Sequence, residues 1–256
     1  MEQYTCLPLL YDQLMEDVDH SAWCAYLLAL ISKDGRQREV KNILELGCGS
    51  GNITRELLAE GYEVVGIDSS FEMLEIARKK TEIYGEKIIL LEQDIREMDF
   101  DIYEIDCVLA VNDTFNYILE EEELLLIFSF IFERLRNGGI FLFDVSSPFK
   151  LSQILGNNTF GESFEDSCYL WENFYEEEEA LLTMELNLFL KTESGVYERS
   201  KETHFQRAHP PEKLKEMLEK AGFSKLRIYA DFSEEEKDCG ELGEAERIFF
   251  CCVKRR

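Results

Sequence analysis

The segment ILELGCGSGNITRELLAEGYEVVGIDSS, residues 43–70, contains two strand patterns separated by a glycine-rich turn and a helix pattern. The apolar run before Gly47 is typical of a buried strand, and Gly49 and Gly51 follow within the turn. Glycine permits a tight turn and lets the backbone approach a ligand closely. The helix that follows offers free amide groups and partial positive charge to an anionic ligand group. The segment therefore predicts a ligand-binding loop between a strand and a helix.

Asp68 ends the second strand of this segment, where its carboxylate can accept hydrogen bonds from both hydroxyls of a ribose. We expect this carboxylate to have no partner within the protein. Ser69 and Glu72 match a capping box that would start the next helix. The dinucleotide fingerprint GxGxxG requires glycine where this chain has Asn52, so a nicotinamide oxidoreductase is disfavoured.

The chain between residues 40 and 145 alternates short apolar strands with amphipathic helices. The expected strands are residues 42–46, 62–67, 87–91, 105–111 and 139–145, and the expected helices are residues 53–60, 71–82 and 120–136. Continuous apolar runs are typical of strands buried on both faces of a parallel sheet. Right-handed crossovers then predict an α/β fold with a doubly wound sheet.

The region 149–207 has a different pattern, with three strand-like stretches separated by turn signals. In its middle stretch, apolar side chains alternate with a period of two: Leu182, Met184, Leu186, Leu188 and Leu190. This alternation predicts antiparallel strands with one wet face. A helix at 211–221 and strands at 225–230 and 247–254 return to the core pattern, and residues 1–35 look helical. We expect three segments: helices and core at 1–148, an antiparallel insertion at 149–207, and the end of the core at 208–256.

Composition narrows the class of protein. The chain has 256 residues, of which 45% are hydrophobic, and a formal net charge of −26, which disfavours nucleic acid and anionic lipid as partners. The N-terminus lacks a signal-peptide pattern, and the longest apolar stretch, 124–132, is too short to span a bilayer, so we expect a cytoplasmic protein. The eight cysteines form no CxxC pair, so we expect free thiols and no metal site: Cys6, Cys24, Cys48, Cys107, Cys168, Cys239, Cys251 and Cys252.

Five segments in order resemble the motif set of class I S-adenosylmethionine-dependent methyltransferases. These segments are ELGCGSG (45–51), VVGIDSS (64–70) with Met73, LLEQDIREMDF (90–100), IDCVLAVNDTFNYI (105–118) and RNGGIFLFDV (136–145). The N-terminal YDQLMEDVDHSAWCAYL (11–27) resembles a bacterial subgroup that carries an antiparallel lid inserted after the fifth strand. The resemblance implies a Rossmann-like, mostly parallel sheet with an antiparallel last strand and a small antiparallel β insertion. It also implies S-adenosyl-L-methionine as the cofactor.

The resemblance also implies roles for individual residues around the methionine and ribose parts of that cofactor. Gly47 and Gly49 would line the methionine part, and Cys48 would contribute its backbone. Asp68 would hold the ribose. Tyr11 would close over the cofactor from the N-terminal helix, although a packing role alone is the alternative.

Further roles concern the adenine and the end of the fourth strand. Ser69 and Met73 would flank the adenine, and core packing is the alternative for Met73. Asp94 would accept a hydrogen bond from the adenine amino group, and Ile95 would offer its backbone. The methionine end would be faced by residues just past the fourth strand: Val111 and Asn112.

The acceptor is less constrained by the sequence than the cofactor. We expect in-line methyl transfer to a small-molecule acceptor, with an amine as one candidate, in a monomer or homodimer. The alternatives are a methyltransferase acting on RNA or protein, or a non-catalytic cofactor-binding protein. A hydroxyl acceptor would need a general base, for which Tyr11, His204 and His209 are candidates. The insertion joins where doubly wound folds bind ligands, so we expect it to cover the acceptor.

Overall fold

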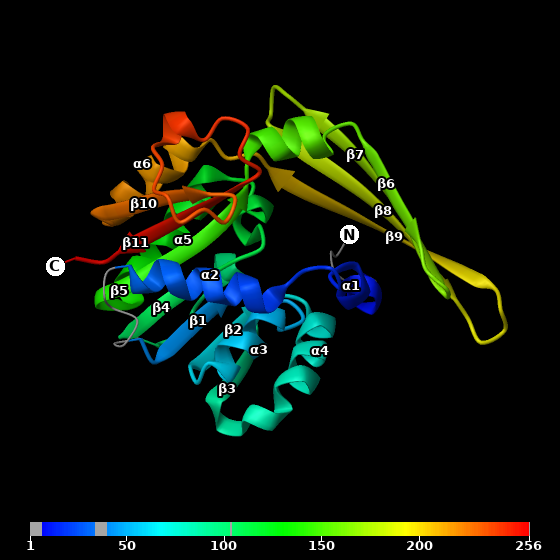
Figure 1. The fold of residues 1–256 in the computed structure, drawn as a ribbon, viewed down its shortest axis with the longest axis horizontal. Coiled ribbons are helices and arrows are strands. Elements are labelled where there is room, and N and C mark those ends of the chain that lie inside the picture. The colour runs from blue at the N-terminus through cyan, green and yellow to red at the C-terminus, as the bar shows by residue number, and fades with distance from the viewer. Residues whose placement is uncertain (1–6, 34–39, 103, 256) are drawn as a thin grey trace.

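The computed structural model describes residues 7–33, 40–102 and 104–255, and Cys6 lies outside them. Two sheets organise the chain (Figure 1): a seven-stranded sheet of order β10-β11-β5-β4-β1-β2-β3 and a four-stranded sheet of order β6-β7-β8-β9. The large sheet contains β1 (Asn42–Leu46), β2 (Glu63–Asp68), β3 (Ile88–Glu92), β4 (Ile105–Ala110), β5 (Leu135–Ser146), β10 (Lys225–Ala230) and β11 (Arg247–Val253). Strands β1 to β5 pair in parallel, whereas β11 runs antiparallel between β5 and β10. The predicted doubly wound sheet with an antiparallel last strand is confirmed.

Helices cover both faces of the large sheet. On one face, α2 (His20–Ser32) and α3 (Asn52–Ala59) pack over β1, β4 and β5 through residues such as Leu27 and Leu57. On the other face, α5 (Glu121–Arg134) and α6 (Pro211–Ala221) contribute Phe128 and Leu218 to a second core. Helix α4 (Phe71–Thr81) lies beside α3 at the β2–β3 side of the sheet. Because β1 to β5 run parallel, their carboxyl ends lie at one edge of the sheet, between the two apolar layers.

Two details of the core differ from the sequence-based prediction. Strand β5 begins at Leu135, directly after α5, and not at residue 139, because the chain enters the sheet without a loop. The prediction that every core strand is buried on both faces is wrong for β3. This strand lies at the edge of the sheet, and Ile89 is 54% exposed.

The insertion between β5 and α6 begins with a π-helical turn, η5 (Lys150–Leu155), and continues as four antiparallel strands. These are β6 (Thr159–Ser163), β7 (Ser167–Glu176), β8 (Leu181–Lys191) and β9 (Tyr197–Arg207). The sequence predicted only three strands, because β6 is exposed along its whole length and lacks an apolar alternation. Four members of the predicted inward row on β8 are buried: Leu182, Met184, Leu186 and Leu188. The fifth, Leu190, is only partly buried, because it lies near the end of the strand.

The N-terminal helix α1 (Pro8–Leu14) connects the insertion to the core (Figure 1). Leu7 and Leu10 pack against Leu186 and Leu188 of the small sheet. The seven cysteines inside the described ranges are free thiols. Among the described residues, no helix is both long and apolar enough to cross a membrane.

Candidate functional site

The glycine loop after β1 has the backbone geometry that the sequence predicts. Gly47, Gly49 and Gly51 all have positive φ, at 67°, 54° and 77°. A Cβ at Gly47 would lie 2.5 Å from Oγ1 of Thr114, whereas the space beside Gly49 is open. A side chain is therefore excluded at Gly47 by packing, and the absence of one at Gly49 leaves room for a ligand.

Asp68 corrects the expectation that its carboxylate lacks a partner in the protein. Oδ2 accepts a hydrogen bond from the amide of Gly49 over 2.8 Å, and Oδ1 accepts from the amide of Ser70 over 2.9 Å. Burial raises the pKa of Asp68, although these backbone donors oppose the shift. The carboxylate therefore also braces the glycine loop against the end of β2.

The predicted capping box at Ser69 is also wrong. The N-cap of α4 is Ser70, whose hydroxyl accepts from the amide of Met73 over 3.2 Å. The helix begins at Phe71, as expected, but its cap is one residue later than the predicted one. Ser69 remains at the rim of the cavity described next.

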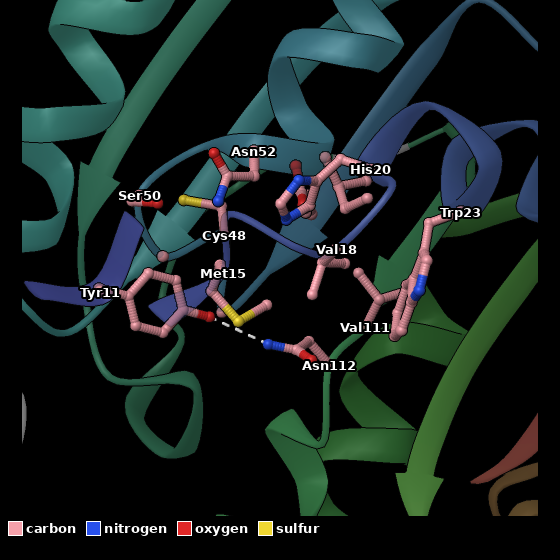
Figure 2. A pocket seen from close by; sticks show the side chains of 14 residues that line it. Tyr11, Met15, Val18, His20, Trp23, Cys48, Ser50, Asn52, Val111 and Asn112 are labelled. Atoms are coloured by element: carbon pink, nitrogen blue, oxygen red, sulfur yellow. Dashed lines mark hydrogen bonds between the residues drawn. The ribbon is translucent and has the colours of Figure 1, made fainter. Parts of the chain in front are cut away.

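Two neighbouring cavities lie along this edge of the sheet. The larger one has a volume of about 820 Å³ and is bordered by Asp68 and by the residues after β3. The smaller one has a volume of about 50 Å³ and lies at the start of α3 (Figure 2). Every residue predicted to contact the cofactor lines one or both: Tyr11, Gly47, Cys48, Gly49, Asp68, Ser69, Met73, Asp94, Ile95, Val111 and Asn112.

Asp94, which is predicted to contact the adenine, has a competing partner within the protein. Asp94 forms an ion pair with Arg96, and its Oδ1 also accepts from the Arg96 amide over 2.8 Å. The side-chain hydrogen bond from Arg96 lowers the pKa of Asp94. Met73 is 2% exposed, so packing explains most of its surface even though it borders the cavity.

The smaller cavity has a buried carboxylate at its base. Glu45 is 2% exposed, and its Oε2 accepts from the Thr54 hydroxyl over 2.6 Å. Burial raises the pKa of Glu45 to about 7, and the Thr54 hydrogen bond opposes this shift. Burial also raises the pKa of the neighbouring Cys48 thiol, which argues against a nucleophilic thiolate and leaves its backbone to form the loop.

Helix α1 is held against the glycine loop by a charged cluster. Lys80 Nζ donates to Oδ1 of Asp12 over 2.6 Å and to Oδ1 of Asn52 over 2.6 Å. Ser50 donates its hydroxyl to the same Asp12 oxygen over 2.8 Å. Asn52, the residue that breaks the dinucleotide fingerprint, thus helps to fasten Tyr11 and the rest of α1 over the cavity.

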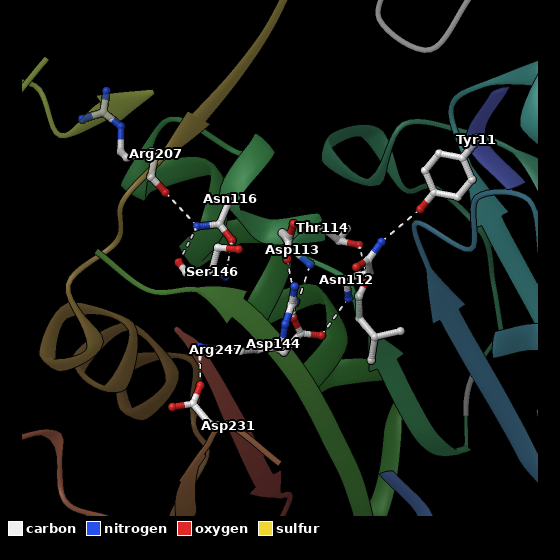
Figure 3. Close-up of polar contacts among 11 residues, drawn as sticks. Tyr11, Asn112, Asp113, Thr114, Asn116, Asp144, Ser146, Arg207, Asp231 and Arg247 are labelled. Atoms are coloured by element: carbon white, nitrogen blue, oxygen red, sulfur yellow. Dashed lines mark hydrogen bonds and ion pairs between the residues drawn. The ribbon is translucent and has the colours of Figure 1, made fainter. Parts of the chain in front are cut away.

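A buried ion-pair network holds the loop after β4 in place (Figure 3). Asn112 and Asp113 both have φ of 62°, a conformation that Asn and Asp adopt more readily than most residues. Asp144 accepts from the Asn112 amide over 2.7 Å and from the Asp113 amide over 3.3 Å. Arg247 bonds both carboxylates. Burial raises the pKa of Asp113, but the charges of Arg247 and Lys150 together with hydrogen bonds keep it below its usual value. The network fixes the direction in which Asn112 points.

Asn116, in the helical turn after that loop, bonds to both ends of the insertion (Figure 3). Its Nδ2 donates to the carbonyl of Ser146 over 3.1 Å and to the carbonyl of Arg207 over 2.9 Å. Its Oδ1 accepts from the Ser146 amide over 2.9 Å. One side chain therefore joins the end of β5, where the insertion begins, to the end of β9, where it returns to the core.

Both histidines predicted as weak candidates for a general base have structural partners. His209 is 1% exposed and donates from Nε2 to the Ile118 carbonyl over 2.9 Å. His204 lies 3.0 Å from Glu202, whose other oxygen accepts from the Leu7 amide. Neither imidazole borders the two cavities, whereas Tyr11 borders both.

Several residues at the site were not assigned roles from the sequence. His20, Trp23 and Glu45 line the smaller cavity, and Tyr117 lines the larger one. All four lie inside segments that resemble the family motifs, so their positions in the sequence could have identified them as site residues. Their side-chain directions depend on how α2 and the loop after β4 pack, which the motifs alone do not specify.

The cavities fit a ligand with a nucleoside part and an amino-acid part. Asp68 can accept from ribose hydroxyls, the open space beside Gly49 admits the chain between the two parts, and Glu45 can pair with an ammonium group. A parallel sheet with such a site at its carboxyl edge defines a nucleoside-binding α/β protein.

Comparisons with known proteins narrow this class. Residues 43–139 match the family described as a methyltransferase domain. Over 246 residues, the chain is 34% identical to a protein of Bacillus subtilis (strain 168) named as the methyltransferase YqeM, covering 96% of this chain and 95% of that one. A crystal structure of an S-adenosylmethionine-dependent methyltransferase from Clostridium acetobutylicum ATCC 824 covers 100% of both chains with 28% identity and a TM-score of 0.84.

A more distant structure has the same fold. The SAM-bound structure of CalS10 from Micromonospora echinaspora, described as an amino pentose methyltransferase, has a TM-score of 0.71 at 15% identity over 95% of both chains. With these matches, the chain belongs to the S-adenosylmethionine-dependent methyltransferases, and S-adenosyl-L-methionine is its cofactor.

Proposed function

We propose that this methyltransferase acts on a small-molecule amine that binds between the cofactor cavity and the inner face of the insertion. The observation that carries the proposal is the acidic rim of the larger cavity. Glu120 and Glu123 border it beside Tyr117. Carboxylates at a cavity mouth raise the local concentration of a cationic ligand, and the net charge of −26 acts in the same direction.

The insertion supplies the cover for this acceptor. Trp171 packs both with the cluster that contains Tyr11 and with the cluster that contains Tyr117, so it bridges the two aromatic residues at the cavity edge. Asn173, on the same face, is 3% exposed, and neither end of its amide has a partner among the described residues. We assign residues 149–207 to acceptor binding, and residues 1–148 and 208–256 to the core that holds the cofactor.

The chemistry requires orientation more than proton transfer. The cofactor would supply an electrophilic methyl group on sulfur. The bound ammonium first loses a proton to water, and the neutral amine then forms its N–C bond as the S–C bond breaks, with the electron pair left on sulfur and the product released as an ammonium ion. The protein must hold the methionine end still and exclude water there. Tyr11 and Asn112 do this, because both border the two cavities. Orientation of this kind contributes about 7–11 kcal/mol to catalysis.

Two further observations support an amine over RNA. The described ranges carry acidic side chains at the cavity rim, where an RNA-binding site would present basic ones. CalS10, which shares the fold, is described as acting on an amino pentose. The free cysteines support a reducing, cytoplasmic location for the reaction.

The test uses methyl-labelled S-adenosylmethionine with acceptors matched in skeleton: cyclohexylamine against cyclohexanol, and D-glucosamine against D-glucose. Total RNA and a protein mixture are run in parallel. We expect label in the amines at least tenfold above the matched alcohols. Glu120→Gln together with Glu123→Gln should raise KM for amines, whereas Glu122→Gln, outside the cavity, should not. Label in RNA or protein, or no preference for amines, would contradict the proposal.

A further inference from the structure

The smaller cavity contains a polar side chain with no partner. His20, the first residue of α2, lines the cavity, and its Nε2 is buried without a hydrogen-bond partner among the residues that the structure describes. Figure 2 shows its ring among the lining side chains, between Asn52 and Trp23 in this view. A buried nitrogen of this kind costs free energy unless a ligand or a water satisfies it.

The charges around His20 differ from those of the molecule as a whole. Burial lowers the pKa of His20, and Lys80 and Arg55 lower it further, which places two cations close to the ring. Glu56 and Asp12 oppose them with smaller effects. Lys80 is paired with Asp12 and Arg55 with Glu56, so the charges beside His20 balance. In a chain with a net charge of −26, this wall therefore repels an anionic ligand group less than the rest of the surface does.

A negative charge lies elsewhere in the same cavity. Glu45 lines it as a buried carboxylate, and the Thr54 hydroxyl bonds only one of its oxygens, Oε2. The cavity therefore presents a hydrogen-bond donor, Nε2 of His20, on a wall whose charges balance, and a carboxylate acceptor, Glu45. This arrangement complements an α-amino acid zwitterion, whose carboxylate and ammonium groups are a few ångströms apart.

We propose that His20 binds the carboxylate of the methionine part of the cofactor, with Nε2–H as the donor, while Glu45 binds the ammonium group. His20 is then the residue by which the protein distinguishes the complete cofactor from nucleosides that lack the amino-acid end. The inference rests on the cofactor and is independent of the identity of the methyl acceptor.

Two commercial ligands separate this role from general packing. S-Adenosylhomocysteine carries the carboxylate and the ammonium group, whereas 5′-methylthioadenosine has the same nucleoside and thioether without them. Calorimetric titration of the full chain should give tighter binding of S-adenosylhomocysteine. In His20→Phe, its affinity should fall by about tenfold or more, because a hydrogen bond to a charged group is lost. The affinity for 5′-methylthioadenosine should change less than twofold, and His20→Gln should restore part of the loss.

Ser21→Ala is the matched control, because the Ser21 hydroxyl donates to Glu56 at an exposed position next to His20. Thermal unfolding of each variant checks that the fold is intact. The inference is overturned if His20→Phe weakens both ligands equally or neither, or if the wild type binds the two ligands with equal affinity. If the wild type binds neither ligand, the cofactor assignment itself fails, and this inference falls with it.

Discussion

The side-chain amide of Asn112 donates a hydrogen bond to the hydroxyl of Tyr11 over 3.0 Å, joining the loop after β4 to helix α1. Both residues border both cavities, so the bond lies where the nucleoside and amino-acid parts of the cofactor would meet. Burial raises the pKa of Tyr11, and the negative charge of Asp113 adds to the effect. The phenol therefore stays protonated, which argues against Tyr11 as a general base.

Removal of the Tyr11 hydroxyl should weaken cofactor binding without unfolding the protein. In Tyr11→Phe, we expect the affinity for S-adenosylhomocysteine to fall by about 2- to 10-fold, the range that one neutral hydrogen bond contributes. Calorimetric titration measures the change. Asn112→Ala removes the same bond from its other end, so the double variant should lose less than the sum of the two single variants. Strict additivity would mean that the two side chains act separately.

Asp68→Ala should reduce both cofactor affinity and stability. The carboxylate is the acceptor available to the ribose, so we expect binding of S-adenosylhomocysteine to weaken by about 10- to 100-fold. The amides of Gly49 and Ser70 also lose their acceptor, which should lower the free energy of unfolding by about 1–3 kcal/mol. Titration and urea unfolding of the same variant measure the two effects. A loss of stability with unchanged affinity would show that Asp68 stabilises the glycine loop and does not bind the ribose.

The buried His209 predicts a stability change with pH. Burial lowers the pKa of His209 to about 4, below its unfolded value of about 6.5. The folded state therefore binds fewer protons, and the stability from neutral His209 is present above about pH 6.5 and is lost as the pH falls towards 4, by up to about 3 kcal/mol. Urea unfolding between these pH values should show a steeper decline for wild type than for His209→Gln. If the free energy of unfolding falls equally with pH in both proteins, the lowered pKa of His209 is contradicted. The affinity for the cofactor at neutral pH should not change in His209→Gln.

Asn173→Leu should stabilise the protein in the absence of an acceptor. Its amide has no partner among the described residues, so replacing it with an apolar side chain of similar size should raise the free energy of unfolding by about 1–3 kcal/mol. Asn187→Leu is the matched control: Asn187 is equally buried in the same sheet but accepts from Arg199 over 3.0 Å, so its replacement should destabilise. Urea unfolding of both variants tests this. A similar loss of stability in both would show that the Asn173 amide is already satisfied.

The sequence predicted elements with strong local signals to within a few residues. The strand Asn42–Leu46 and the helix Pro211–Ala221 match the structure, because apolar runs, glycine and proline define their ends. The glycine loop and the residues around it also meet as expected, since parallel strands bring their carboxyl ends to one edge.

The features that the sequence could not predict depend on contacts between distant segments. Asp144 and Arg247 are separated by 103 residues, and nothing local indicates that they share the support of Asn112. The cap at Ser70 depends on where the Asp68 carboxylate points, which follows from the position of the glycine loop. The direction of the His20 ring likewise requires the packing of α2 against α3.

The bonds of Asn116 to the Ser146 and Arg207 backbones have a consequence for how such enzymes diversify. A segment whose two ends meet at one point can be exchanged, lengthened or shortened without altering the span that the rest of the chain must bridge. The small sheet can therefore be replaced as one unit during evolution. Under the proposed assignment of this segment to acceptor binding, its exchange at these two junctions would change the acceptor, as long as the new segment keeps the packing against Leu7 and Leu10.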